Sequence, residues 1–204
     1  MTTMMDERKF QALQDYCTRN VPRPPYAQKT KFGTYLPTPL VRARTAFEYL
    51  LREGIIREGE NFLDAGSGDG RIVALACLFG LNGVGVECNP HLVETSETLL
   101  SGLNTRGILN RTPRIAYGDF LQDNTYQSLS LPFEEANVVF NYFNNHLDLA
   151  RKVARQSRAG TRFLLYDWEK EACVFNGLEH IADITLDESC EERYRDDYLH
   201  VYIK

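Results

Sequence analysis

Carboxylates and glycines gather in one short stretch of the sequence, where residues 64–70 read D-A-G-S-G-D-G. The stretch follows an apolar run at 62–63 and precedes a helical pattern at 71–79. A second apolar run at 83–86 ends at Glu87. A strand, a glycine turn, a helix, a second strand and a carboxylate in this order are typical of the nucleotide-binding half of an α/β fold. We expect Glu87 to accept hydrogen bonds from both hydroxyls of a ribose.

The glycines Gly66, Gly68 and Gly70 have a physical task, because the strand must turn sharply into a helix while its backbone lies against a ligand. The spacing differs from the G-x-G-x-x-G of dinucleotide sites, and Asp69 would crowd a phosphate at the helix N-terminus. The two carboxylates around the loop, Asp64 and Asp69, suit a ligand that carries an ammonium and a sulfonium. The sequence therefore predicts a site for S-adenosylmethionine (SAM), with a structural turn that binds no ligand as the alternative.

The rest of the chain supplies the elements that would position this site. We expect an α/β, Rossmann-like sheet of seven strands, mostly parallel, with a C-terminal antiparallel hairpin at its edge and helices on both faces. Thr38 is predicted to cap the first of these helices, with Pro39 in its first turn. The expected strands are 62–64, 84–87, 115–117, 136–140, 163–166, 180–186 and 198–203, and the expected helices run to about residues 53, 79, 103 and 156.

The first 34 residues read as a separate N-terminal appendage before a domain that spans 35–204. A helix is predicted over 5–18, with Phe10, Leu13 and Cys17 on one apolar face. A proline-rich link follows. The appendage either packs on the main domain or closes over the site, and a disordered tail is the alternative.

Ligands of open α/β sheets bind beyond the carboxyl ends of the central strands. After the third strand, Asp119 can accept from an adenine amino group and Phe120 can cover the base. After the fourth strand, the run N-Y-F-N-N at 141–145 lies where a methyl acceptor should approach. Neutral amides there can orient an amine without adding a charge that must be desolvated. After the fifth strand, Trp168 could wall an acceptor channel.

The composition of the chain indicates which kinds of partner and cellular compartment to expect. The net charge of −5 disfavours a broad phosphate-binding face and makes a nucleic-acid partner unlikely. No apolar run is long enough to span a bilayer, and the N-terminus shows no secretion signal. Five scattered cysteines contain no C-x-x-C pair, so we expect reduced thiols, no metal and a cytoplasmic protein.

Three motifs resemble class I SAM-dependent protein lysine methyltransferases. They are Y-L-P-T-P at 35–39, D-A-G-S-G-D-G-R-I at 64–72 and G-V-E-C-N-P at 85–90. The chain is most similar to the small archaeal and mitochondrial enzymes, and more distantly to the Dot1-like histone lysine methyltransferases. The run at 141–145 most resembles the Asn-Asn of the Dot1 type. The glycine loop alone indicates only a class I methyltransferase, whereas the P-T-P lead-in joined to G-D-G-R-I is more specific.

The resemblance implies that SAM is the cofactor and that lysine of a protein is the acceptor. It also implies that 35–38 folds over the cofactor, which brings Tyr35 and Thr38 to the site. Cofactor contacts are expected at Asp64, Gly66, Gly68, Glu87 and Asp119, with Phe120 beside the base.

The expected reaction is an in-line displacement at the sulfonium methyl, which depends on alignment and on a deprotonated amine rather than on a strong general base. We expect Asn141, Tyr142 and Tyr35 to orient the acceptor, while His91 and His146 are candidates for a base by residue type only. A small-molecule or RNA acceptor, and a SAM-binding module that does not turn over, remain the alternatives.

Overall fold

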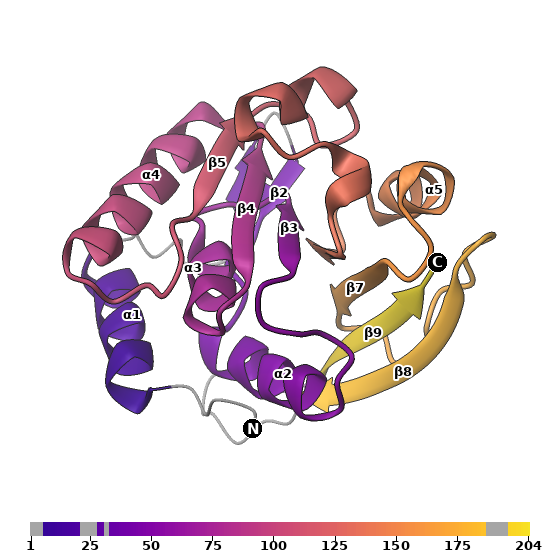
Figure 1. Ribbon diagram of the computed structural model, residues 1–204, viewed down its shortest axis with the longest axis horizontal. Helices are drawn as coiled ribbons and strands as arrows, with labels where there is room; N and C mark the ends of the chain where they lie inside the picture. Colours follow the sequence, from indigo (N-terminus) through magenta and orange to yellow (C-terminus); the bar gives the residue numbers. More distant parts are fainter. Residues whose placement is uncertain (1–5, 21–27, 31–32, 187–195) are drawn as a thin grey trace.

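Seven strands form the central sheet of the computed structural model, in the order β5-β4-β3-β6-β7-β9-β8 (Figure 1). The structure describes residues 6–20, 28–30, 33–186 and 196–204. β3 to β7 run parallel, whereas β9 pairs antiparallel with both β7 and β8. The strands are β3 (Asn61–Ala65), β4 (Asn82–Glu87), β5 (Arg114–Tyr117), β6 (Val138–Tyr142), β7 (Arg162–Asp167), β8 (Glu179–Leu186) and β9 (Asp197–Ile203). The predicted fold class is confirmed.

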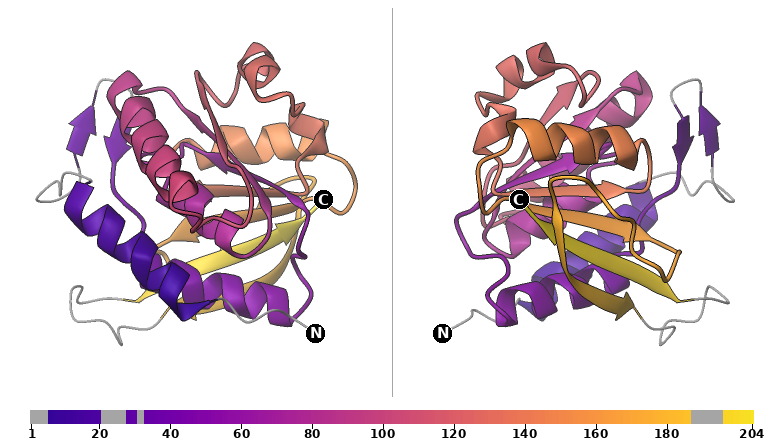
Figure 2. Two further views of the ribbon diagram at one scale, coloured as in Figure 1. Left: turned by 60° about the vertical axis from the view of Figure 1, so that its left-hand side comes forward. Right: turned by 90° about the vertical axis from the view of Figure 1, so that its right-hand side faces the viewer.

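Helices cover both faces of the sheet (Figure 2). One face carries α2, α3 and α4, and the other carries α5 with two short 3-10 helices. Phe62 belongs to the first layer, where its ring packs 5.4 Å from that of Phe47 on α2. Leu63 belongs to the second layer, together with Val153 of α5. The helices are α1 (Glu7–Asn20), α2 (Leu40–Arg52), α3 (Arg71–Leu78), α4 (Pro90–Thr105), α5 (His146–Gln156), η1 (Asp123–Leu129) and η2 (Phe133–Glu135).

Helix α1 lies outside α3 and α4 and joins the first of these layers (Figures 1 and 2). Its predicted apolar face is buried, since Phe10, Leu13 and Cys17 are at most 6% exposed. The helix therefore packs on the main domain, while the domain boundary at residue 35 stays a prediction. Most of the predicted proline-rich link lies outside the described residues. Two short strands, β1 (Gln28–Thr30) and β2 (Gly33–Tyr35), form a separate antiparallel pair that the sequence did not indicate.

Two sequence-based boundaries are wrong. Thr38 does not cap α2, because the helix begins at Leu40 and Pro39 occupies the N-cap without a side-chain hydrogen bond. The fourth expected strand, 136–140, is displaced by two residues, because β6 continues through Asn141 and Tyr142. Asn141 is tolerated inside the sheet because its side-chain amide donates to the carbonyl oxygen of Ala65 at 2.7 Å.

A buried ion pair fixes α2 to the antiparallel part of the sheet. Arg42 lies 2.5 Å from the carboxylate of Asp197 at the start of β9, and both side chains are at most 5% exposed. The hydroxyl of Tyr166 donates to the same carboxylate at 2.7 Å. This network joins α2, β7 and β9 beneath the site.

Among the described residues, we find no helix with the length and apolar character that a membrane span requires.

Candidate functional site

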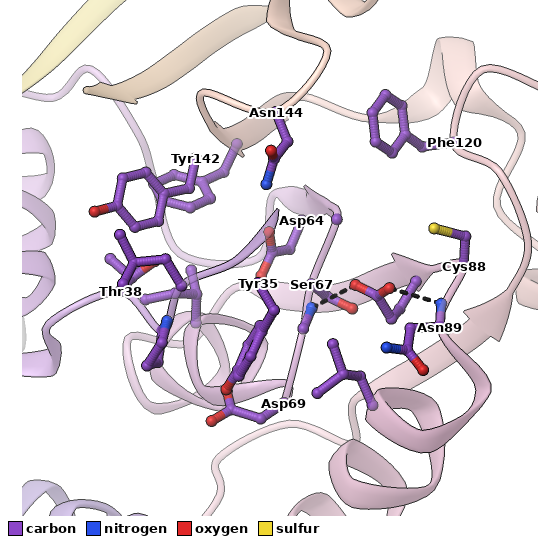
Figure 3. Close-up of a pocket in the computed structure, with 18 of the residues that line it drawn as sticks. Tyr35, Thr38, Asp64, Ser67, Asp69, Cys88, Asn89, Phe120, Tyr142 and Asn144 are labelled. Atoms are coloured by element: carbon purple, nitrogen blue, oxygen red, sulfur yellow. Dashed lines mark hydrogen bonds between the residues drawn. The ribbon is translucent and has the colours of Figure 1, made fainter. Parts of the chain in front are cut away.

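A cavity of about 440 Å³ lies at the carboxyl ends of β3, β4 and β6, where the topology of the sheet predicts a ligand (Figure 3). Its volume is in the range of small-molecule sites. Its wall combines carboxylates, backbone amides and aromatic rings. All seven cofactor residues expected from the sequence line it, and so do two of the expected acceptor residues; they are Thr38, Asp64, Gly66, Gly68, Glu87, Asp119 and Phe120, with Tyr35 and Tyr142.

Glu87 holds the glycine loop and the start of α4 at the same time. Its Oε2 accepts from the backbone N–H of Gly68 at 2.9 Å, and its Oε1 accepts from the backbone N–H of Asn89 at 2.8 Å. Each carboxylate oxygen has a second lone pair, which these bonds leave available. The side chain is 7% exposed and lines the cavity. The expected ribose-binding position is therefore an oriented, partly desolvated carboxylate.

The glycine loop lies closely against the lead-in segment. Gly66, Gly68 and Gly70 all have positive φ, at 89°, 54° and 80°. A Cβ at Gly68 would lie 2.7 Å from Cε2 of Tyr35, so the ring of Tyr35 occupies the space that any other residue would fill. This contact places the lead-in against the loop, while the expectation that 35–38 folds over a cofactor stays a prediction.

Asp69 lines the cavity and is paired with Arg71. Arg71 donates to it through Nε and Nη2, with the closest contact at 2.5 Å. The hydroxyl of Tyr35 lies beside the same carboxylate (Figure 3). Burial and the neighbouring Asp69 raise the pKa of Tyr35, so its hydroxyl stays protonated. From the sequence we expected the negative charge of Asp69 to face a cationic ligand. In the structure Arg71 balances that charge.

Asp64 ends β3 beneath the cavity and is 3% exposed. Burial raises its pKa well above the ordinary value, and the carboxylates of Glu87 and Asp69 raise it further. Without a cation nearby, a buried carboxyl in this setting favours its protonated form. A cationic ligand would reverse that preference, so Asp64 is suited to an ammonium.

One end of the cavity offers a flat, mixed surface. Asp119 is exposed, and its Oδ1 accepts from the backbone N–H of Leu121 at 2.8 Å. Phe120 is 8% exposed and Tyr117 is 62% exposed, and both line the cavity.

Cys88 also lines the cavity. Burial and the neighbouring Glu87 raise the pKa of its thiol to about 11, so the thiol is protonated at neutral pH and does not act as a thiolate nucleophile.

The segment after β6 is held in an unusual backbone conformation. Phe143 and Asn145 have positive φ, at 38° and 51°, which is rare for residues other than glycine. Between them, Asn144 donates from its side chain to the carbonyl oxygen of Thr34 at 2.9 Å. Tyr142 and Asn144 both line the cavity. Strained backbone that positions a polar side chain is common at functional sites.

Several predicted residues do not reach the cavity wall. Asn141 points toward Ala65 and Gly66 at the carboxyl end of β3 and is 1% exposed, and its Oδ1 has no partner among the described residues. Trp168 packs against Phe143, with ring centroids 4.1 Å apart. His146 contacts the carbonyl oxygen of Phe143 through Nδ1, and His91 is exposed on α4. Neither histidine lines the cavity.

The sequence reasoning missed Arg71 and Tyr117 as parts of the site, and it did not single out Asn144 within the run at 141–145. Asn144 belongs to the N-Y-F-N-N run, and the displaced end of β6 is what moves it to the cavity in place of Asn141. Arg71 directly follows the acidic glycine loop, so its charge was an available signal. Tyr117 ends β5 just before Gly118, a position that strand-end reasoning could have identified.

The fold is that of the class I SAM-dependent methyltransferases, as comparison with solved structures shows. The sequence itself matches no protein-family model and no curated protein.

Three of the similar solved structures are methyltransferases of different substrates. An RNA methyltransferase from Salinibacter ruber, bound to S-adenosyl-L-homocysteine, has 24% identity and a TM-score of 0.55 over 82% of this chain and 93% of its own. Magnesium protoporphyrin IX methyltransferase from Synechocystis, with bound SAM, has 12% identity and a TM-score of 0.60 over the full length of both chains. The C-terminal domain of precorrin-6Y C5,15-methyltransferase from Rhodobacter capsulatus has 17% identity and a TM-score of 0.55 over 89% and 97%.

Proposed function

We propose that the protein is a SAM-dependent methyltransferase. The observation that carries this proposal is the Glu87 carboxylate, which two backbone amides orient at the end of β4 inside a cavity of suitable size. The likeness to solved methyltransferases with SAM or S-adenosylhomocysteine bound supports the same ligand. The fold alone does not carry the activity, because one fold hosts many functions.

The residues present fit SAM. Glu87 would hold the ribose hydroxyls, and Asp64 the ammonium of the methionine part. Asp119 would accept from the adenine amino group while Phe120 covers the base. The lead-in at Tyr35 and Thr38 would close the side of the cavity opposite the sheet. SAM, when bound, supplies a methyl group on a sulfonium that acts as a good leaving group.

For the acceptor, we propose the amine of a protein lysine. The proposal rests on the motif resemblance and on the neutral amide and aromatic groups at the acceptor side. Nitrogen would attack the methyl carbon as the carbon–sulfur bond breaks, which leaves S-adenosylhomocysteine and releases one proton. Tyr142, Tyr35 and Asn144 would orient the amine. Asn141 would position the turn into the glycine loop through the carbonyl of Ala65.

RNA is the second candidate, because the similar structure with the highest identity among those described above is an RNA methyltransferase. The net charge of −5 argues against it, since RNA binding depends strongly on cationic contacts with phosphates. A small-molecule acceptor is the third outcome, in view of the tetrapyrrole methyltransferases with this fold.

Two measurements test the proposal. Calorimetric titration should show that SAM and S-adenosylhomocysteine bind with one site per chain, and absence of binding to the folded protein would refute the cofactor assignment. Incubation with methyl-labelled SAM and a cell lysate should then place the label in protein, and chemical blocking of lysines should remove it. Label found only in RNA or in small solutes would overturn the lysine assignment, and binding without any transfer would overturn the enzymatic one.

A further inference from the structure

A cluster of two histidines and one aspartate lies on the β8–β9 hairpin at the sheet edge, apart from the cavity (Figure 1). His180 and Asp183 are three residues apart on β8, a spacing that puts side chains on opposite faces of a regular strand. The pairing shifts register between His180 and Ala182, so His180 pairs with Tyr202 and Asp183 pairs with His200. The irregularity therefore brings His180, Asp183 and His200 to one face, as β-bulges do at functional sites.

The three side chains meet at one carboxylate oxygen. Oδ1 of Asp183 lies 2.8 Å from Nε2 of His180 and 2.6 Å from Nδ1 of His200. One ligand atom from each residue lies within 4.8 Å of the other two.

One ring nitrogen of His200 faces the Asp183 carboxylate, and the other is held by the backbone. Its ring is 1% exposed, and its Nε2 lies 2.9 Å from the carbonyl oxygen of Glu169, which requires a proton on that nitrogen. In the neutral ring, Nδ1 then carries a lone pair that faces the Asp183 oxygen. A metal ion between the two atoms would accept a lone pair from each of them.

We propose that His180 Nε2, His200 Nδ1 and the Asp183 carboxylate bind a divalent transition-metal ion of the zinc class. Two imidazoles and a carboxylate are ordinary zinc ligands, and the exposed edge leaves a position for water. The Nε2–H of His200 bonded to a backbone carbonyl is the usual outer support of a metal-bound histidine. This proposal is independent of the methyltransferase assignment and replaces the expectation from the cysteine pattern that no metal binds.

The cluster needs only a small adjustment to hold the ion. Bonds of about 2.0–2.1 Å at tetrahedral angles separate ligand atoms by about 3.3 Å. The two short contacts of 2.8 and 2.6 Å would therefore open by about 0.5 and 0.7 Å, while the two imidazole nitrogens, which lie within 4.8 Å of each other, would come to the same separation. His180 and Asp183 are 35% and 45% exposed and can move by that amount. His200 can stay in place, because its ring stacks on Tyr198 at 6.2 Å with an interplanar angle of 12°.

Binding would join three segments. β8 supplies His180 and Asp183, β9 supplies His200, and the hydrogen bond from His200 ties in the segment after β7 at Glu169. We therefore expect the ion to stabilise the folded protein in proportion to its affinity and free concentration. Its role is structural, because the site lies outside the cavity wall.

Titration of the chelator-treated full chain with Zn²⁺ and with Co²⁺ tests the site. We expect one equivalent to bind at micromolar or lower concentration, to raise the melting temperature, and to give Co²⁺ d–d bands without thiolate charge-transfer bands. His180→Ala and Asp183→Asn, both at exposed positions, should weaken binding by at least about tenfold. His91→Ala, at an exposed histidine on α4, is the matched control and should bind as the wild type does.

Three results would overturn the proposal. They are no uptake by the wild-type chain, thiolate bands in the Co²⁺ spectrum, or equal affinity in the His180 and Asp183 variants. Circular dichroism spectra that match the wild type's show that both variants are folded, so a loss of binding can then be assigned to the lost ligand.

Discussion

Replacement of Glu87 gives the sharpest test of the cofactor site. Each oxygen of this carboxylate already accepts one backbone N–H, and each retains one lone pair for a ribose hydroxyl. A hydrogen bond to a charged group contributes about 1.5–3 kcal/mol, so two of them would contribute about 3–6 kcal/mol to the free energy of SAM binding. Glu87→Gln removes the charge and one acceptor, and should weaken SAM binding by about 1.5–3 kcal/mol, or roughly 10–150-fold. Glu87→Ala should weaken it more.

Calorimetry with S-adenosylhomocysteine and its 2′-deoxy and 3′-deoxy forms separates the ribose contact from the order of the loop. The wild type should lose affinity for each deoxy form, whereas Glu87→Ala should bind all three alike, because the partner of the hydroxyls is already gone. Glu94→Gln, on the exposed side of α4, is the charge-matched control and should bind normally. Affinity of Glu87→Gln within about twofold of wild type, in a folded protein, would refute the assignment.

Three further predictions follow from other contacts. Gly68→Ala should abolish most SAM binding and lower the free energy of unfolding by about 1–3 kcal/mol, because its Cβ would lie 2.7 Å from Tyr35. In denaturant titrations, the loss of stability should be smaller on a Tyr35→Ala background. Because burial raises the pKa of Asp64, the affinity for SAM should rise with pH until this carboxyl ionises in the free protein. Asp64→Asn should flatten that dependence and raise the melting temperature of the ligand-free protein. A wild-type affinity that does not change with pH would contradict this. Arg42→Ala should cost about 3–5 kcal/mol in free energy of unfolding, because it leaves Asp197 as an unpaired buried charge, and a loss below about 1 kcal/mol would show that the pair contributes little.

Residue type and order were sufficient to predict the first βαβ unit and its place in the site. Asp64, the glycine loop and Glu87 lie in one continuous stretch whose chemistry is local, so the sheet position of the site followed directly. The end of β6 did not follow, because Asn141 reads as a turn residue and only its bond to Ala65 makes it compatible with a buried strand.

Long-range contacts account for the rest of what the sequence could not predict. The side chain of Asn144 reaches the backbone of Thr34, 110 residues away, and no periodicity encodes such a pairing. The packing of Tyr35 on Gly68 is of the same kind, because it requires the lead-in to fold across the glycine loop. The His180, Asp183 and His200 cluster was also hidden, because a spacing of three on a strand ordinarily separates side chains rather than joining them.

The order of the last two strands has a kinetic consequence. β9 lies between β7 and β8, although β8 precedes it in the chain. β8 therefore joins the sheet only through β9, which pairs with β7 across 31 residues at Asp167 and Tyr198 and across 41 residues at Arg162 and Ile203. Such non-local pairing is slow to form and leaves apolar surface temporarily uncovered. Refolding experiments should accordingly find the hairpin to be the last region to gain protection from hydrogen exchange.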